Sequence, residues 1–378
     1  MNFAGTIVLL SLSTLCCSTL CCAQADRSQD DSASVWHDPS PHRREMISVE
    51  QDVQLEVLDW GGKGRPLIFL SGLGNTSHIW DNFAPKFTAH HHVYAITRRG
   101  FGRSTHASSG FTAQRLGDDV LAVMDQLKID RPVLVGHSLG GEELSSIGTR
   151  HPERIAGLIY LDAAYTYAFF DAAGNYATSL ADAQQKLAAL ALKPNDVDLM
   201  EQAKGSVKQF EENLERKLND KRYPLPPTMP SPSAEDKASF TAMLRRMTQA
   251  TGGTPPEAEI HESFLPGPNG SVGGLTASPD AARHIFEAPE HFTTPIPVPI
   301  LAVMGYPQSK GFAFHADTPQ MIAAAAAADA DQARQIDAFE RGQPTATVLR
   351  IANANHYIFI SNEAQVLEAM DKFLAALP

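Results

Sequence analysis

One short segment constrains the fold of this chain more than any other: residues 136–140 have the sequence Gly-His-Ser-Leu-Gly. The apolar run 132–135 before it predicts a buried strand, and residues 139–150 after it predict a helix. A strand that turns directly into a helix must bend sharply, and the glycines at both ends leave room for that bend. The turn exposes the hydroxyl of Ser138 at the end of a sheet, beside backbone N–H groups that favour negative charge. The segment therefore predicts a nucleophilic serine.

Short apolar runs alternate with segments of helical periodicity along most of the chain. Uninterrupted apolar strands separated by helices predict an α/β fold with a mostly parallel sheet, covered by helices on both faces. The first two strands are expected to pair within residues 45–60. The other expected strands lie at 66–70, 92–96, 132–135, 155–161, 299–304 and 345–351, and the expected helices at 113–127, 139–150, 319–340 and 363–377.

The alternation breaks part-way along the chain. Residues 165–292 are helix-prone but polar, and they carry a proline-rich break at 224–232. We interpret this range as a helical cap inserted into the α/β core. The core then has a first part at 46–164 and a second part at 293–378.

The N-terminus has the pattern of an export signal. Residues 2–25 carry no charged side chain, and Ala-Gln-Ala at 23–25 has the small-x-small form that a signal peptidase accepts. We expect residues 1–25 to be a cleaved signal peptide, residues 26–45 to be a polar linker, and the protein to be periplasmic or secreted. The alternative is an uncleaved membrane anchor, because residues 3–23 are long enough to span a bilayer.

Composition excludes several classes of function. All four cysteines lie within the predicted signal peptide, so the mature chain would have no disulfide, thiolate nucleophile or cysteine-based metal site. The net charge of −12 repels phosphate backbones and anionic lipid. We therefore expect no nucleic-acid partner, and no stable membrane insertion once the signal is removed. No histidine cluster has the spacing of metal ligands, so we expect no metal and no cofactor.

Three segments together resemble the α/β-hydrolase family, and the resemblance covers nearly all of the chain after residue 25. Residues 136–141 (GHSLGG) are similar to the sharp turn on which that family carries its nucleophile. Residues 70–74 (LSGLG) are similar to its oxyanion loop, although many members have His-Gly where this chain has Ser-Gly. Residues 98–104 (RRGFGRS) are similar to the turn after the following strand.

In this family the nucleophile is followed along the chain by an acid and then by a histidine. The resemblance implies that His356, just after the last predicted strand, is the general base. The usual position of the acid lies after the first strand that follows the cap, but no Asp or Glu occurs in residues 291–316. Asp162, at the end of the strand before the cap, is therefore the expected acid, as in some family members. Asp317 is the alternative.

The resemblance also implies where the substrate would be held. The backbone N–H groups of Leu73 and Leu139 are expected to form the oxyanion hole, which binds the negative charge that develops on the substrate. The side chains of Trp80 and His137 are expected to line the substrate pocket.

These observations together predict a serine hydrolase that cleaves a carboxylic ester of a small molecule through an acyl-enzyme intermediate. The cap is expected to set the size of the substrate. Two alternatives stay open: a hydrolase of amides or peptides, and a ligand-binding member of the fold without catalysis. A serine nucleophile argues against haloalkane and epoxide chemistry, for which this fold uses aspartate.

Overall fold

The computed structural model describes residues 36–171, 176–222, 231–278, 281, 284–285, 292–309 and 318–378. Two compact units divide the chain, Met1–His37 and Asp38–Pro378, and the second contains every element described below. The predicted signal peptide (1–25) and the alternative acid Asp317 lie outside the described residues. Among the helices that are described, none is long and apolar enough to cross a membrane.

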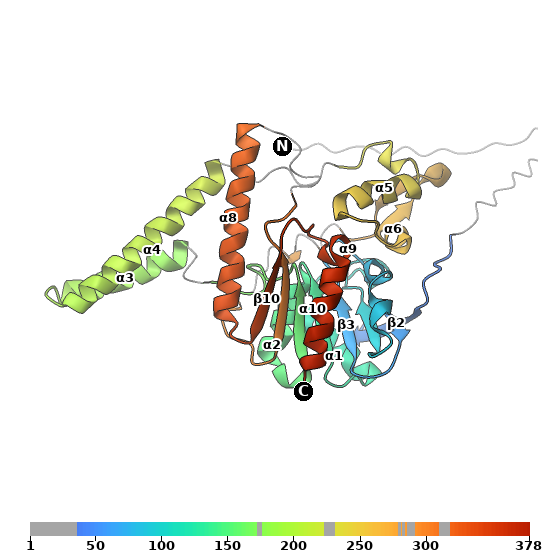
Figure 1. Cartoon of the computed structure of the whole chain (residues 1–378), viewed down its shortest axis with the longest axis horizontal. Coiled ribbons are helices and arrows are strands. Elements are labelled where there is room, and N and C mark those ends of the chain that lie inside the picture. Colours follow the sequence, from blue (N-terminus) through green and yellow to red (C-terminus); the bar gives the residue numbers. More distant parts are fainter. Residues whose placement is uncertain are drawn as a thin grey trace, which may run out of the picture. The chain divides into compact units, whose positions relative to one another are not determined.

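An eight-stranded sheet forms the centre of the second unit, with strand order β1-β2-β4-β3-β5-β6-β9-β10 (Figure 1). β2 pairs antiparallel with β1 and with β4, and every other neighbouring pair is parallel. The predicted α/β class with a mostly parallel sheet is confirmed. The strands are β1 (Arg43–Glu50), β2 (Val53–Gly61), β3 (Leu67–Leu70), β4 (Val93–Ile96), β5 (Val133–His137), β6 (Gly157–Leu161), β9 (Ile300–Gly305) and β10 (Ala346–Ile351).

The first strand takes up the last residues of the range 26–45, which the sequence predicted to be a linker. β1 begins at Arg43, which pairs with Asp59 of β2 in the ladder. The Arg43 guanidinium also donates to the Asp59 carboxylate at 2.9 Å. The strand therefore starts with a charged residue that is held by an ion pair. Because β1 is an edge strand with polar residues on its open face, its start has no apolar signal in the sequence.

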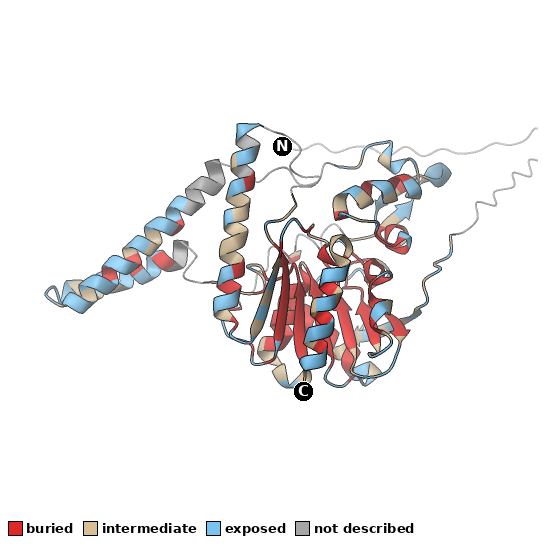
Figure 2. Ribbon diagram, viewed as in Figure 1, coloured by how far each residue is buried: buried red, intermediate tan, exposed pale blue. Residues whose placement is uncertain are grey.

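The sheet separates two hydrophobic clusters, one on each face (Figure 2). Consecutive strand residues alternate between them: Ile68 and Leu134 belong to one cluster, and Phe69 and Val135 to the other. This is the period-two geometry of a strand, and each such buried side chain contributes about 1.5–3 kcal/mol. The first cluster is covered by α1 (Ala113–Leu127), α2 (Gly140–Arg150) and α8 (Pro319–Gly342), and the second by η1 (Ser77–Trp80), η2 (Ala84–Phe87), α9 (Ile358–Ser361) and α10 (Glu363–Ala376).

The chain between β6 and β9 forms an insertion, in the range 165–292 that the sequence predicted to be a cap. Its described part contains a helical hairpin and then a second group of helices with a two-stranded sheet. Met243, Ile260 and Val272 form a small core for the second group. The elements are α3 (Tyr176–Leu192), α4 (Val197–Arg222), η5 (Asp236–Ala238), α5 (Phe240–Thr251), α6 (Glu257–Ser263), β7 (Phe264–Pro266), η6 (Pro268–Gly270) and β8 (Val272–Leu275).

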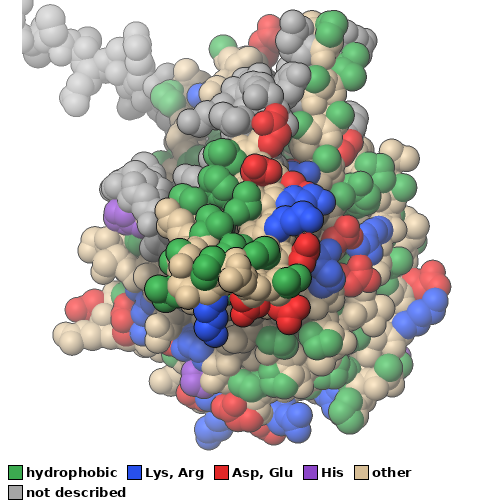
Figure 3. Space-filling view, turned by 90° about the vertical axis from the view of Figure 1, so that its left-hand side faces the viewer, with side chains coloured by type: hydrophobic (Ala, Val, Ile, Leu, Met, Phe, Trp, Pro, Cys, Tyr) green, Lys and Arg blue, Asp and Glu red, His purple; other side chains and the backbone are tan. Residues whose placement is uncertain are grey.

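The hairpin of α3 and α4 pairs through small and polar side chains. Ala183, Ala203 and Asn213 are buried, and Asn213 donates a hydrogen bond to Ser179 across the pair. Large apolar side chains, Leu192 among them, are exposed. On the face shown in Figure 3, apolar side chains lie among charged ones.

Candidate active site

The turn from β5 into α2 places Ser138 in the left-handed region, with a φ of 48°. A non-glycine residue in that region stores roughly 1–2 kcal/mol of backbone strain. A Cβ on Gly136 would lie 2.8 Å from the backbone of Gly140, and a Cβ on Gly140 would lie 2.7 Å from the carbonyl oxygen of Leu70. The two glycines are therefore required by close approaches of the backbone. The predicted sharp strand-to-helix turn is present, and Ser138 is partly exposed at it.

Asp162, the first residue after β6, meets His356 from the loop after β10. Asp162 Oδ2 and His356 Nδ1 are 2.6 Å apart, although the residues are 194 positions apart in the sequence. The carboxylate is fully buried, and it also accepts hydrogen bonds from the Gly305 N–H at 3.0 Å and from Gln308 Nε2 at 2.6 Å. A carboxylate in this position favours the Nδ1–H tautomer of the imidazole and leaves Nε2 available as a base.

His137 links the turn at Ser138 to the loop that carries His356. Its Nε2 lies 3.0 Å from the His356 carbonyl oxygen, and the two ring centroids are 4.7 Å apart. Burial, together with the nearby His356, lowers the pKa of His137 well below 6.5, so the neutral ring donates from Nε2. Ser138 and His356 are both among the described residues and form no direct hydrogen bond in this structure. Such bonds between catalytic groups often tighten when substrate binds.

The loop after β3, residues 71–76, is called the oxyanion loop because the sequence predicts that role for residues 70–74. It runs directly against the turn at Ser138. A Cβ on Gly72 would lie 3.1 Å from Ser138 Cβ and 2.9 Å from His137 Nδ1, so glycine is required there. Leu73 and Leu139 lie in the same small apolar cluster. Their backbone N–H groups donate no hydrogen bond to any residue that the structure describes. Two unused N–H donors next to a serine are the groups that an oxyanion hole requires.

The α/β-hydrolase fold family matches residues 65–363, which is well over half of the chain. The chain belongs to the α/β-hydrolase family. This α/β-hydrolase is 35% identical over 108 residues to a bifunctional esterase/perhydrolase of Acinetobacter calcoaceticus, and 35% identical over 120 residues to a non-heme chloroperoxidase of Streptomyces lividans. These matches cover 28% and 31% of the chain. The chain spans less than half of those relatives, at 39% and 44% of their lengths.

Solved structures of other α/β-hydrolases superpose on most of the chain. E-2-(acetamidomethylene)succinate hydrolase has a TM-score of 0.58 at 16% identity, covering 89% of this chain and 100% of that one. An esterase from a Rhodococcus species has a TM-score of 0.51 at 14% identity, with the same coverage of 89% and 100%. At these identities the likeness shows the shared fold.

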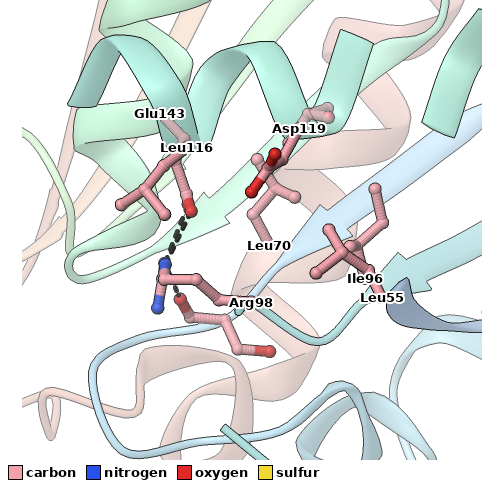
Figure 4. Close-up of a pocket in the computed structure, with 9 residues that line it drawn as sticks. Leu55, Leu70, Ile96, Arg98, Leu116, Asp119 and Glu143 are labelled. Carbon is pink, nitrogen blue, oxygen red and sulfur yellow. Dashed lines mark hydrogen bonds and ion pairs between the residues drawn. The ribbon is translucent and has the colours of Figure 1, made fainter. Parts of the chain in front are cut away.

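A buried ion pair supports the oxyanion loop of this α/β-hydrolase (Figure 4). Arg98, which follows β4, donates two hydrogen bonds to the Glu143 carboxylate of α2, at 2.6 and 2.8 Å. The same guanidinium donates to the carbonyl oxygen of Ser71 in the loop at 2.9 Å. The pair lies at the wall of an internal cavity of about 10 Å³, which is too small for a substrate. Arg98 and Glu143 therefore have a structural role.

The insertion reaches the same loop through Glu259 of α6. Its carboxylate accepts hydrogen bonds from Asn75 Nδ2 at 2.9 Å and from the Thr76 N–H at 3.1 Å, as well as from the hydroxyls of Thr76 and Ser263. Burial raises the pKa of Glu259 to about 7, although these donors oppose the rise. No local pattern in the sequence indicates this contact, because Glu259 lies in a polar helix 183 positions from Thr76.

Trp80 does not line an open pocket, contrary to the sequence prediction. Its ring is fully buried, with its centroid 4.2 Å from that of Phe359 and 5.0 Å from that of Phe69. The indole N–H donates to Ser71 Oγ at 3.0 Å, so Trp80 supports the oxyanion loop. His137, the other predicted pocket residue, is also buried, and its contacts are within the protein. Buried aromatic rings of this kind contribute strongly to the stability of a core.

Tyr167, near the start of the insertion, adds a phenol beside Ser138 that the sequence analysis missed. Burial and the nearby Asp162 carboxylate raise the pKa of Tyr167 well above 10, so the hydroxyl stays protonated. The hydroxyl lies close enough to Ser138 for that side chain to act against the rise. No residue that the structure describes is aligned with it for a regular hydrogen bond, and the local sequence indicated only a loop.

Proposed function

We propose that this α/β-hydrolase is a serine hydrolase that cleaves a carboxylic ester of a small molecule. The observation that carries the proposal is the 2.6 Å contact between the buried Asp162 carboxylate and His356 Nδ1. This pair lies at the same end of the sheet as Ser138, since β5 and β6 are adjacent parallel strands. A carboxylate so placed orients the imidazole and stabilises the imidazolium that forms during acyl transfer.

In the proposed mechanism, His356 Nε2 removes the proton from Ser138 Oγ as that oxygen attacks the carbonyl carbon of the ester. The backbone N–H groups of Leu73 and Leu139 donate to the resulting oxyanion, and one such donor contributes about 3 kcal/mol to the transition state. The imidazolium then gives its proton to the leaving alkoxide, which leaves an acyl-enzyme. A water molecule deprotonated by the same imidazole hydrolyses the acyl group and restores Ser138.

An ester is favoured over other substrates by the relative that is named a bifunctional esterase/perhydrolase. An amide is the alternative, because the same groups can protonate an amine leaving group. A pair of matched substrates, p-nitrophenyl acetate and p-nitroacetanilide, separates the two. The proposal expects rapid release of p-nitrophenol and little release of p-nitroaniline.

The nucleophile is tested by labelling with a fluorophosphonate and by the burst of p-nitrophenol from p-nitrophenyl acetate. Wild type should be labelled at Ser138, and Ser138→Ala should lose both labelling and burst. Ser108→Ala is the control, because Ser108 is exposed. A Ser138→Ala variant that turns over like wild type contradicts the mechanism. If wild type itself shows neither labelling nor burst, the protein is a ligand-binding member of the fold.

We also propose that the protein is exported, on the strength of the N-terminal sequence. Residues 2–25 carry no charge and end in Ala-Gln-Ala. Intact-mass measurement of the protein isolated from the periplasm or medium should give a chain that begins at Asp26. A chain that keeps residues 1–25 and sediments with membranes would support the anchor instead.

A further inference from the structure

Four side chains with metal-binding atoms gather next to the oxyanion loop, apart from the catalytic groups. Asp38 and His42 lie in the segment that leads into β1, and His78 and Asp81 belong to η1 and the residue that follows it. One potential ligand atom from each lies within 4.8 Å of all the others. Their side chains are only 14%, 5%, 0% and 2% exposed, so the cluster is almost closed to solvent.

Three distances within the cluster are close to the edge length of a tetrahedral coordination shell. His78 Nδ1 is 3.2 Å from Asp38 Oδ2 and 3.0 Å from Asp81 Oδ2. With Nε2 as the ligand atom of His42, its 3.3 Å distance to Asp38 Oδ2 is a third edge of the same shell. Ligands about 2.0 Å from a tetrahedral Zn²⁺ lie about 3.3 Å apart. Imidazole nitrogens combined with carboxylate oxygens suit Zn²⁺, whereas Ca²⁺ and Mg²⁺ prefer oxygen ligands alone.

A zinc-binding histidine usually donates its other N–H to a carboxylate or carbonyl, and His42 has such a partner. With Nε2 of His42 on the ion, its Nδ1 faces Asp81 Oδ1 at 2.9 Å. The other nitrogen of His78, Nε2, lies 3.4 Å from Arg44 Nη2 and 3.6 Å from Oε1 of the buried Glu56. Arg44 forms an ion pair with this same oxygen at 3.0 Å. Asp38 Oδ2, on the Nδ1 side of the ring, is buried without an aligned hydrogen-bond donor among the described residues.

The cluster concentrates negative charge at its centre. The carboxylates of Asp38 and Asp81 both face His78 Nδ1, and both are nearly enclosed by protein. A divalent cation between these groups would satisfy both carboxylates and take Nδ1 as a ligand.

We propose that Asp38, His42, His78 and Asp81 form a structural Zn²⁺ site. The protein supplies all four positions of a tetrahedral shell, which is the closed arrangement of structural zinc. The ion fastens the segment before β1 to η1, which follows the oxyanion loop. This proposal departs from the sequence expectation of no metal. The spacing showed no sign of a site because its two halves, at 38–42 and 78–81, are brought together only by the fold.

The test measures the metal content and thermal stability of the full-length chain, expressed without a histidine tag and purified without chelator. Elemental analysis should find about one zinc per chain. Dialysis against EDTA should lower Tm by about 5–10 °C, and ZnCl₂ but not MgCl₂ should restore it. Loading with Co²⁺ should give the visible absorption of a tetrahedral cobalt site, which reports coordination independently of stability.

His42→Gln and Asp81→Asn each remove one ligand and should weaken zinc retention by more than about tenfold. His92→Gln is the matched control, because His92 pairs with Asp59 at 2.8 Å outside the cluster and should retain zinc. The proposal is overturned if wild type retains no zinc and its Tm responds to neither EDTA nor ZnCl₂. It is also overturned if both ligand variants bind Zn²⁺ and Co²⁺ as wild type does.

Discussion

Glu259→Gln tests how the insertion controls the oxyanion loop. The wild-type carboxylate accepts hydrogen bonds from Asn75, from the N–H and hydroxyl of Thr76, and from Ser263. Glutamine keeps the shape of the side chain but replaces one accepting oxygen by an NH₂ donor. At least one of the four donors must then turn its oxygen toward this NH₂ group or lose its partner.

The size of the effect follows from these contacts. The introduced glutamine would keep its oxygen at the position of Glu259 Oε1, where Asn75, Ser263 and the Thr76 N–H all donate. The NH₂ group then faces the Thr76 hydroxyl, which can turn and accept from it, so a charge-assisted hydrogen bond is exchanged for a neutral one at a cost of about 1–2 kcal/mol. For a domain of this size we expect Tm to fall by about 1–3 °C. Because Leu73 lies in the same loop, partial loss of its role in the oxyanion hole should lower kcat by about tenfold.

The pH dependence has a definite sign. The pKa of Glu259 rises from an ordinary value of 4.5 to about 7 in the folded protein. Stability from the protonated carboxyl is therefore fully present below pH 4.5 and is lost as the pH rises through 7. Because glutamine does not titrate, the advantage of wild type over the variant should be greater near pH 5 than near pH 8.

The assay combines Tm by scanning fluorimetry at these two pH values with kcat and KM on p-nitrophenyl acetate. Glu257→Gln is the matched control, because Glu257 lies on the same helix and its side chain is 51% exposed. The control should change stability by less than about 0.5 kcal/mol. If Glu259→Gln behaves like this control in both Tm and kcat, the carboxylate does not hold the loop and the reasoning is refuted.

Three further substitutions test other parts of the site. Asp162→Asn should lower kcat by about 10⁴-fold with an unchanged circular dichroism spectrum, because the amide favours the wrong tautomer of His356; near-normal turnover would exclude Asp162 as the orienting acid. Arg98→Gln leaves the Glu143 carboxylate buried without its cation and should cost about 3–5 kcal/mol in urea unfolding. A loss below about 1 kcal/mol would show that the pair is dispensable. Gly72→Ala places a methyl group 2.9 Å from a side chain of the nucleophile turn, so esterase activity should fall more than about tenfold while Tm falls by a few degrees; full activity would contradict the close approach.

The sequence was sufficient to predict the sheet and the turn at Ser138. The strands are continuous apolar runs because the sheet is covered on both faces, and parallel order then follows from the helices between them. The glycines of residues 136–140 mark a turn that a Cβ would block. Asp162 was predicted from its place at the end of a strand adjoining the nucleophile strand, and the structure places it 2.6 Å from His356.

The residues that support the site could not be predicted, because each contacts a partner far away in the sequence. Gln308 bonds to Asp162 across 146 positions, and Glu259 bonds to the oxyanion loop across 183. A polar side chain in a loop or polar helix gives the same local pattern whether it faces solvent or a buried partner. The burial of Trp80 could not be predicted for the same reason. The ring that covers it, Phe359, comes from near the end of the chain.

The position of Asp162 directly after β6 leaves most of the proposed reacting groups on the N-terminal side of the insertion. The oxyanion loop, Ser138 and Asp162 all precede the insertion, and of the proposed triad only His356 follows it. The chain leaves the sheet after β6 and returns beside it as β9. The insertion can therefore diverge in length and composition during evolution without displacing the reacting groups, provided that β9 and β10 still join the sheet in register and deliver the imidazole.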